Sequence, residues 1–274
     1  MRITKTEEIM KQSLDMACLE KIPADSAIYV QGKGIKKVLF SIDAGVPELL
    51  LAKELGCDCV IAHHPVGGTA ILNFYKVFQR HVAQMIVAGV PREEAEKAVK
   101  KKSADLEVDA HSRNYDHAVE VARLLKMPYM NIHTPLDEIG RRIMSEKISE
   151  KITSDSTVQD VVAALYELPE FKAATTRIEI RVGQAKDPAG KVAVSHGAGT
   201  NGGYEIARIY FKHGVRTVVY IHVGLGDLEK LKAEANGNLI VSGHIASDSV
   251  GINPFIRELR KRGIDVTTIG VIAP

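Results

Sequence analysis

Seven of the ten histidines in this chain stand directly after a short run rich in Val, Ile, Leu or Ala. They are His63, His64, His111, His133, His196, His222 and His244. Short apolar runs separated by helical patterns are typical of parallel strands, and ligands bind at the carboxyl ends of such strands. Because histidine is the commonest metal ligand, we expect a metal site at these strand ends.

Two carboxylates stand near these histidines at spacings that suit a shared metal ion. Asp248 follows His244 by four residues, which places both side chains on one face of a helical turn. Asp116 follows His111 by five residues and lies at the start of a helical pattern, and its two oxygens could bridge two ions. Nitrogen and oxygen ligands without a thiolate suit Zn, Fe, Mn, Co or Ni.

These residues also have purely structural interpretations. Asp116 and Asp248 could cap helices or interact with a helix dipole. His133 and His196 could hydrogen-bond carbonyl groups at strand ends. The glycine-rich loop at residues 197–203 lies between a strand and a helix, so it could bind a phosphate or simply form a tight turn.

Composition narrows the class of protein. The chain has 274 residues and a net charge of +2, so no strong electrostatic field favours binding to nucleic acid. It contains no apolar stretch long enough to span a bilayer, no signal-peptide core at its start, and an odd number of cysteines, three. We therefore expect a cytoplasmic protein that does not enter a membrane.

Strand and helix patterns alternate along the chain, which predicts the α/β class with mostly parallel sheets. The segment at 137–175 is mostly helical, and no strand pattern interrupts it. We therefore expect two α/β domains, a metal-binding one at 1–135 plus 236–274 and a second one at 136–235. In this division the last strand and helix fold back on the N-terminal half, and the metal site lies at the carboxyl ends of strands.

Several segments, in their order along the chain, resemble those of a known family. They are Asp43 after a strand, the His-His-Pro motif at 63–65, residues 111–116, the strand and loop at 192–199, and the Gly-His motif at 243–251. The pattern resembles the Ngg-one-interacting-factor-three family, whose members are described as GTP cyclohydrolase I type 2 homologues or dinuclear-metal-centre proteins. The resemblance covers nearly the whole chain.

This resemblance implies a toroidal homohexamer of two-domain α/β subunits, each with two divalent metal ions. The family's metal ligands fall on His63, His64, Asp116, His244 and Asp248, although the family usually has Glu in the last position. Its His-Thr-x-x-Asp element falls on residues 111–116 with one inserted residue. The stretch from His133 to Asp137 is a competing match, closer in letters but later in the chain, and we prefer Asp116 as the bridging carboxylate.

The family's Thr-Gly-Glu after the penultimate strand is absent, and His222 stands there instead. It could therefore face the ligand cavity. By analogy with the family, we expect a metal-dependent hydrolase that acts on a small molecule, either a nucleotide or a phosphate ester. His111 or His133 would act as acid–base groups. The alternative is a ring-shaped metal-binding scaffold or regulatory partner without catalytic activity.

Overall fold

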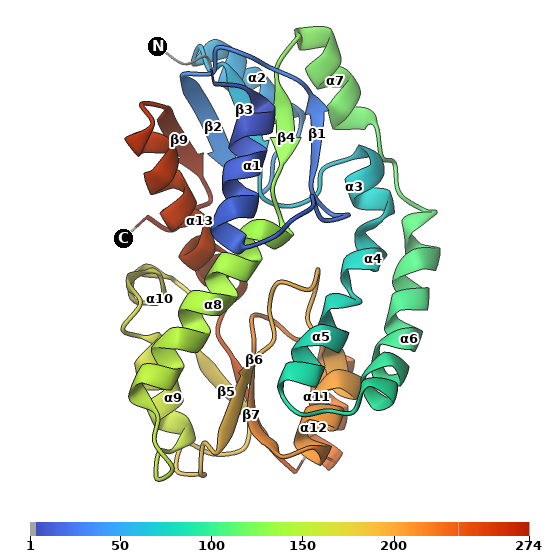
Figure 1. Cartoon of the computed structure of the whole chain (residues 1–274), viewed down its shortest axis with the longest axis vertical. Helices are drawn as coiled ribbons and strands as arrows, with labels where there is room; N and C mark the ends of the chain where they lie inside the picture. Colours follow the sequence, from blue (N-terminus) through green and yellow to red (C-terminus); the bar gives the residue numbers. More distant parts are fainter. Residues whose placement is uncertain (1–3, 235, 274) are drawn as a thin grey trace. The chain divides into compact units, whose positions relative to one another are not determined.

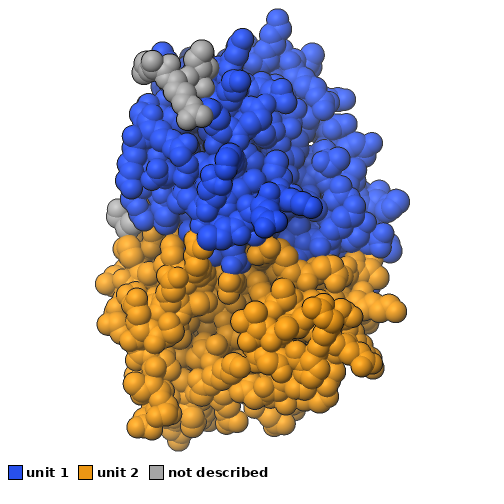
Figure 2. Space-filling model, in the orientation of Figure 1, with its two compact units in different colours: residues 1–77, 105–139, 251–271 blue, residues 78–104, 140–250, 272–274 orange. Residues whose placement is uncertain are grey.

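The structure, a computed structural model, describes residues 4–234 and 236–273. The chain divides into two compact units, which Figure 2 colours separately. Unit 1 comprises residues 1–77, 105–139 and 251–271, and unit 2 comprises residues 78–104, 140–250 and 272–274. Relative to the division expected from the sequence, residues 78–104 and 236–250 belong to unit 2, so His244 and Asp248 are part of that unit, whereas residues 136–139 belong to unit 1.

Unit 1 is built on a five-stranded sheet with the order β1-β4-β3-β2-β9 (Figure 1). Its strands are β1 (Ala27–Val30), β2 (Lys37–Ser41), β3 (Cys59–Ala62), β4 (Tyr129–Asn131) and β9 (Asp265–Ile269). β9, β2, β3 and β4 run parallel, while β1 pairs antiparallel with β4. The pairing of β9 with β2 confirms that the last strand folds back on the N-terminal half.

Helices cover both faces of this sheet. Wholly within unit 1 lie α1 (Thr6–Ala17), α2 (Val46–Glu54), α3 (Gly68–Leu72), α4 (Phe74–Val77) and α7 (His117–Leu125). α2 and α7 share one buried cluster with Leu39 of β2. The next residue, Phe40, faces the other side and packs edge-on against Phe255 of α13 (His244–Lys261), with ring centroids 6.5 Å apart.

Unit 2 contains a four-stranded sheet with the order β5-β8-β7-β6. Its strands are β5 (Glu179–Val182), β6 (Lys191–Val194), β7 (Val215–Tyr220) and β8 (Asn238–Val241). The remaining helices are α5 (Arg80–Val87), α6 (Arg92–Ala110), α8 (Thr134–Lys151), α9 (Val158–Leu165), α10 (Pro169–Ala173), α11 (Gly203–Lys212) and α12 (Leu225–Glu234). α8, α9 and α10 pack against β7 and β8 through a buried cluster that includes Phe171 and Val219.

The two sheets repeat one topology. In each, the first strand pairs antiparallel with the fourth, and the fourth, third and second follow in parallel order. The antiparallel pair also has the same irregularity, between Ile28 and Val30 in β1 and between Ile180 and Val182 in β5. The fourth strand of each sheet is followed by an 18-residue helix, α8 or α13. The sequence showed no repeat, so this internal repeat is evident only in the structure.

The structure also corrects some expected elements. Residues 106–110, which resemble a strand before His111, are the last part of α6. The preceding residues of α6 are mostly Glu, Lys and Ala, which favour a helix, and no turn residue interrupts them. Residues 72–89 have the sequence pattern of a single helix, but the structure divides them mainly between α4 and α5. Among the described residues, no helix is long and apolar enough to cross a bilayer.

Candidate metal centre

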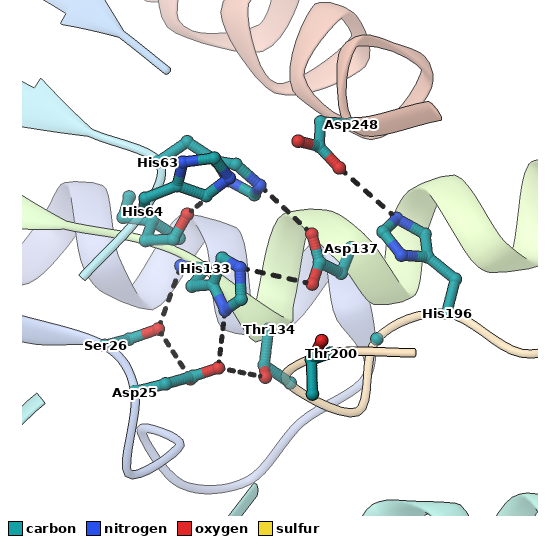
Figure 3. Close-up of polar contacts among 12 residues, drawn as sticks. Asp25, Ser26, His63, His64, His133, Thr134, Asp137, His196, Thr200 and Asp248 are labelled. Carbon is teal, nitrogen blue, oxygen red and sulfur yellow. Dashed lines mark hydrogen bonds and ion pairs between the residues drawn. The ribbon is translucent and has the colours of Figure 1, made fainter. Parts of the chain in front are cut away.

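The carboxyl ends of β3 and β4 bring three imidazoles together in unit 1 (Figure 3). His63 and His64 follow β3 directly, and His133 lies two residues after the neighbouring β4. The ring centroids are 5.0 Å apart for His63 and His64, 4.9 Å for His63 and His133, and 5.6 Å for the third pair. One possible ligand atom of each side chain lies within 4.8 Å of the others. These three strand-end histidines therefore form a cluster that could hold a metal ion.

Hydrogen bonds at Nδ1 orient the two histidines after β3. Nδ1 of His63 donates to the carbonyl oxygen of Ile132 at 3.0 Å, and the His63 ring is fully buried. Nδ1 of His64 donates to Oδ1 of Asp43 at 2.7 Å, where the carboxylate is 84% exposed. A carbonyl or carboxylate at Nδ1 fixes the proton there and leaves Nε2 as the basic nitrogen, as in histidines that bind metals.

The third imidazole is held by a buried carboxylate that the sequence did not identify. Nδ1 of His133 donates to Oδ2 of Asp25 at 2.7 Å, and the hydroxyl of Thr134 donates to the same oxygen at 2.7 Å (Figure 3). Ser26 adds a hydrogen bond to Asp25 Oδ1 at 3.3 Å and accepts from the His133 amide at 3.0 Å. Asp25 itself has no exposed surface. In the sequence, Asp25 lies in a turn-like stretch just before β1, and the sequence pattern does not indicate a strand there.

Asp137 completes the group in unit 1. It lies in the first turn of α8, four residues after His133, and is almost fully buried. Its Oδ1 lies 3.1 Å from Nε2 of His63, and its Oδ2 lies 3.7 Å from Nε2 of His133. Both rings carry their proton on Nδ1, so basic nitrogens and carboxylate oxygens face one another. A cation stabilises such an arrangement, and the donors therefore fit a divalent metal ion.

Unit 2 carries a second group at the corresponding strand ends. His244 is the first residue of α13, and its Nε2 lies 3.4 Å from Oδ2 of Asp248, one turn further along the helix. His196 lies two residues after β6, and its Nε2 is 3.9 Å from Oδ1 of the same carboxylate (Figure 3). Asp248 is 1% exposed, whereas the His244 side chain is 43% exposed. The pair expected from its four-residue spacing therefore does point to a common position.

His222 joins this group from the end of β7. Its ring centroid lies 4.8 Å from that of His244, and its Nδ1 accepts a hydrogen bond from Nδ2 of Asn201 at 2.9 Å. Burial, together with the neighbouring His244, lowers the pKa of His222 to about 4. His222 is therefore neutral at physiological pH. Asn201 was not among the residues expected from the sequence.

The glycine-rich loop between β6 and α11 is anchored by side chains of α5. Nε of Arg80 donates to the carbonyl of Gly197 at 2.7 Å, and Nε2 of His81 donates to the carbonyl of Thr200 at 2.9 Å. Burial lowers the pKa of His81 to about 4, so this histidine is neutral as well. These contacts agree with the tight-turn interpretation of the loop, which fixes the positions of His196 and Asn201.

Two of the expected site residues lie apart from both groups. Asp116 occupies the N-cap position of α7, without a hydrogen bond from its side chain to the helix. His111 is exposed in the turn after α6. Within the described ranges, neither belongs to a group of possible ligand atoms that lie close together, whereas Asp137 does. The geometry thus favours Asp137, the competing match from the sequence, over Asp116.

Comparison with known proteins identifies the family of this chain. The sequence model of the Duf34/NIF3 (NGG1p interacting factor 3) family matches residues 1–273, which include both units. The chain belongs to the NIF3 family. A NIF3 superfamily protein from Sphaerobacter thermophilus is 51% identical, with a TM-score of 0.95 and coverage of 97% of this chain and 98% of that one. The family suggested by the His-His-Pro and Gly-His motifs is therefore confirmed.

More distant structures share the fold alone. Reduced HcgD from Methanocaldococcus jannaschii is 12% identical, with a TM-score of 0.59 and coverage of 97% of this chain and 98% of that one. The Staphylococcus aureus hypothetical protein SA1388 is 13% identical, with a TM-score of 0.55 and coverage of 98% and 97%. No curated protein sequence matches the chain.

Proposed function

We propose that this NIF3-family protein is a metal-dependent hydrolase that acts on a nucleotide or another phosphate ester. The observation that carries the proposal is the group in unit 1, where Nε2 of His63 and of His133 faces one buried carboxylate, Asp137. When bound, a divalent ion supplies Lewis acidity and activates water near neutral pH. The donors suit Zn, Fe, Mn, Co or Ni.

Each unit contains proposed metal ligands. The proposed metal ligands are His63, His64 and Asp137 in unit 1, and His244 and Asp248 in unit 2. We expect about two ions per chain, because paired ions are common in hydrolases of phosphate esters. The homohexameric assembly and the cytoplasmic location expected from the sequence remain predictions.

His133 is the proposed acid–base group. Its Nδ1 proton is held by the buried Asp25 carboxylate, so proton transfer to or from a substrate takes place at Nε2. A buried carboxylate at Nδ1 stabilises the imidazolium that forms when Nε2 accepts a proton. Asp25 thus orients the ring.

Metal content per chain tests the ligand assignment. We expect Asp137→Ala and His63→Ala to lose metal relative to the wild type in elemental analysis of the purified protein. Asp116→Ala is the matched control, because it makes the same Asp-to-Ala change at a different place, the N-cap of α7. If Asp116→Ala lost metal while Asp137→Ala retained it, the assignment would be wrong.

Turnover tests the enzymatic part. The metal-loaded protein is expected to hydrolyse at least one member of a panel of nucleotides and aryl phosphates, and His63→Ala is expected to be inactive although folded. Tight metal binding without turnover of any member would favour the alternative role as a metal-binding scaffold.

A further inference from the structure

His222 differs from the other strand-end histidines in what its Nδ1 contacts. The side-chain amide of Asn201 is fixed by the backbone, because its Oδ1 accepts a hydrogen bond from the Gly203 amide at 3.0 Å. The other end of this amide, Nδ2, therefore points to Nδ1 of His222, 2.9 Å away. Since an amide nitrogen only donates, Nδ1 of His222 must accept.

This hydrogen bond determines the tautomer of His222. A neutral imidazole that accepts at Nδ1 carries its proton on Nε2. The doubly protonated ring is disfavoured, because it would place an N–H group opposite the N–H of Asn201. His222 therefore presents an N–H donor, and not a basic nitrogen, at the end of β7.

The equivalent position in unit 1 shows the opposite arrangement. His64 and His222 each lie two residues after the last residue of the third strand of their sheet, β3 or β7. Nδ1 of His64 meets the Asp43 carboxylate, so Nε2 of His64 is basic and suits a metal. At this equivalent position, unit 1 thus has a nitrogen that suits a metal, and unit 2 has a hydrogen-bond donor.

The geometry points to His222 as an oxyanion-binding residue, which we propose donates from Nε2 to a phosphate oxygen of the substrate and does not bind metal. The His222 ring lies beside the partly exposed His244, within reach of a group bound at that ligand. Hydrogen bonds to a charged acceptor are stronger than neutral ones, and a fixed donor costs no reorganisation. This proposal rests on the proposed function and names the chemistry that binds its substrate.

The tautomer can be measured directly by 15N NMR of the histidine side chains in the full-length protein. Nδ1 of His222 is expected to give the signal of an unprotonated nitrogen, and Nε2 that of a protonated one. In Asn201→Asp a carboxylate oxygen replaces the amide nitrogen at nearly the same position, so the tautomer should reverse. A wild-type signal with the proton on Nδ1 would overturn the proposal.

Calorimetric titration of the metal-loaded protein with inorganic phosphate tests the role of His222 as an oxyanion donor. His222→Ala is expected to weaken phosphate binding about tenfold, equivalent to about 1.4 kcal/mol, with unchanged metal content. Asn201→Asp should weaken phosphate binding as well. His117→Ala, which removes an exposed histidine from the start of α7, is the control and should bind phosphate like the wild type.

The outcomes separate this proposal from the proposed function. If His222→Ala released metal as His63→Ala is expected to do, or left phosphate affinity unchanged, His222 would not be an oxyanion donor. If the wild type held no metal, the proposed function would fail. The tautomer and a phosphate titration of the metal-free protein would then still decide the role of His222.

Discussion

Removing the Asp25 carboxylate is expected to destabilise unit 1 far more than removing a similar carboxylate nearby. Asp25 and Asp43 each accept from Nδ1 of a site histidine at 2.7 Å. Asp25 is fully buried, whereas Asp43 is 84% exposed. Asp25→Ala and Asp43→Ala therefore make the same chemical change in opposite environments.

The expected magnitudes follow from the hydrogen bonds. Asp25→Ala deprives the buried Nδ1 of His133 and the buried hydroxyl of Thr134 of their acceptor. Each hydrogen bond to a charged group contributes roughly 1.5–3 kcal/mol, so the free energy of unfolding should fall by about 3–6 kcal/mol. Asp43→Ala should cost about 0–1 kcal/mol, since exposed pairs are screened by solvent.

Asp25→Asn separates charge from hydrogen bonding. The amide oxygen can take the position of Oδ2 and accept from His133, while the amide nitrogen faces the Ser26 hydroxyl, which can also accept. We therefore expect an intermediate loss of roughly 1–2 kcal/mol, the part due to charge. Hydrolysis should nevertheless fall strongly, because a neutral amide does not stabilise the His133 imidazolium.

The assay is urea unfolding of the metal-free protein, followed by circular dichroism at neutral pH. Metal-free protein is used because a ligand that binds the folded state alone would change the apparent stability. If Asp25→Ala cost no more than Asp43→Ala, the reasoning about the buried network would be refuted.

Three further predictions concern the surroundings of the site. His81 has a pKa of about 4, below the ordinary value of 6.5. Its contribution to the free energy of unfolding is therefore fully present above pH 6.5 and is lost as the pH falls towards 4. Stability should decrease by ~3 kcal/mol from pH 6.5 to 4 because of this residue, and His81→Gln should show a correspondingly flatter pH profile in urea unfolding. Gly67→Ala should destabilise the loop after His64, because an added Cβ would overlap the Tyr115 carbonyl; wild-type thermal stability would contradict this. Thr157→Ala removes the capping box of α9 and should cost ~1 kcal/mol, whereas an unchanged urea midpoint would show that the cap is not needed.

The sequence predicted the fold class, and it located histidines at the ends of strands, because both depend on local patterns. Apolar runs define β3, β4, β6, β7 and β8, and each is followed within three residues by a histidine. The spacing between His244 and Asp248 equals one helical turn, so their convergence follows from helix geometry alone. The strand interpretation of residues 106–110, before His111, was wrong for the same local reason, because this apolar run continues a helix.

Strand order could not be obtained from local patterns, and it decides which carboxylate reaches the histidines. The order of segments along the chain favours Asp116 over Asp137, which comes later. β4 pairs directly with β3, so the residues after β4 lie beside His63 although some seventy positions separate them in sequence. The buried Asp25 depends on the same pairing, since β1 joins the sheet through β4.

The internal repeat explains why one chain carries two similar groups with different chemistry. The fourth strand of each sheet is followed by a histidine and, four residues later, an aspartate, which gives His133 with Asp137 and His244 with Asp248. Strand topology and helix spacing fix these positions in both copies, so they need no similarity in the rest of the sequence. The topology does not fix which atom contacts Nδ1 of His64 or of His222, because that atom belongs to a loop residue, Asp43 or Asn201. Replacing a carboxylate by an amide at that point changes a basic nitrogen into a donor, and therefore a single loop residue can convert a metal ligand into a residue that binds an anion.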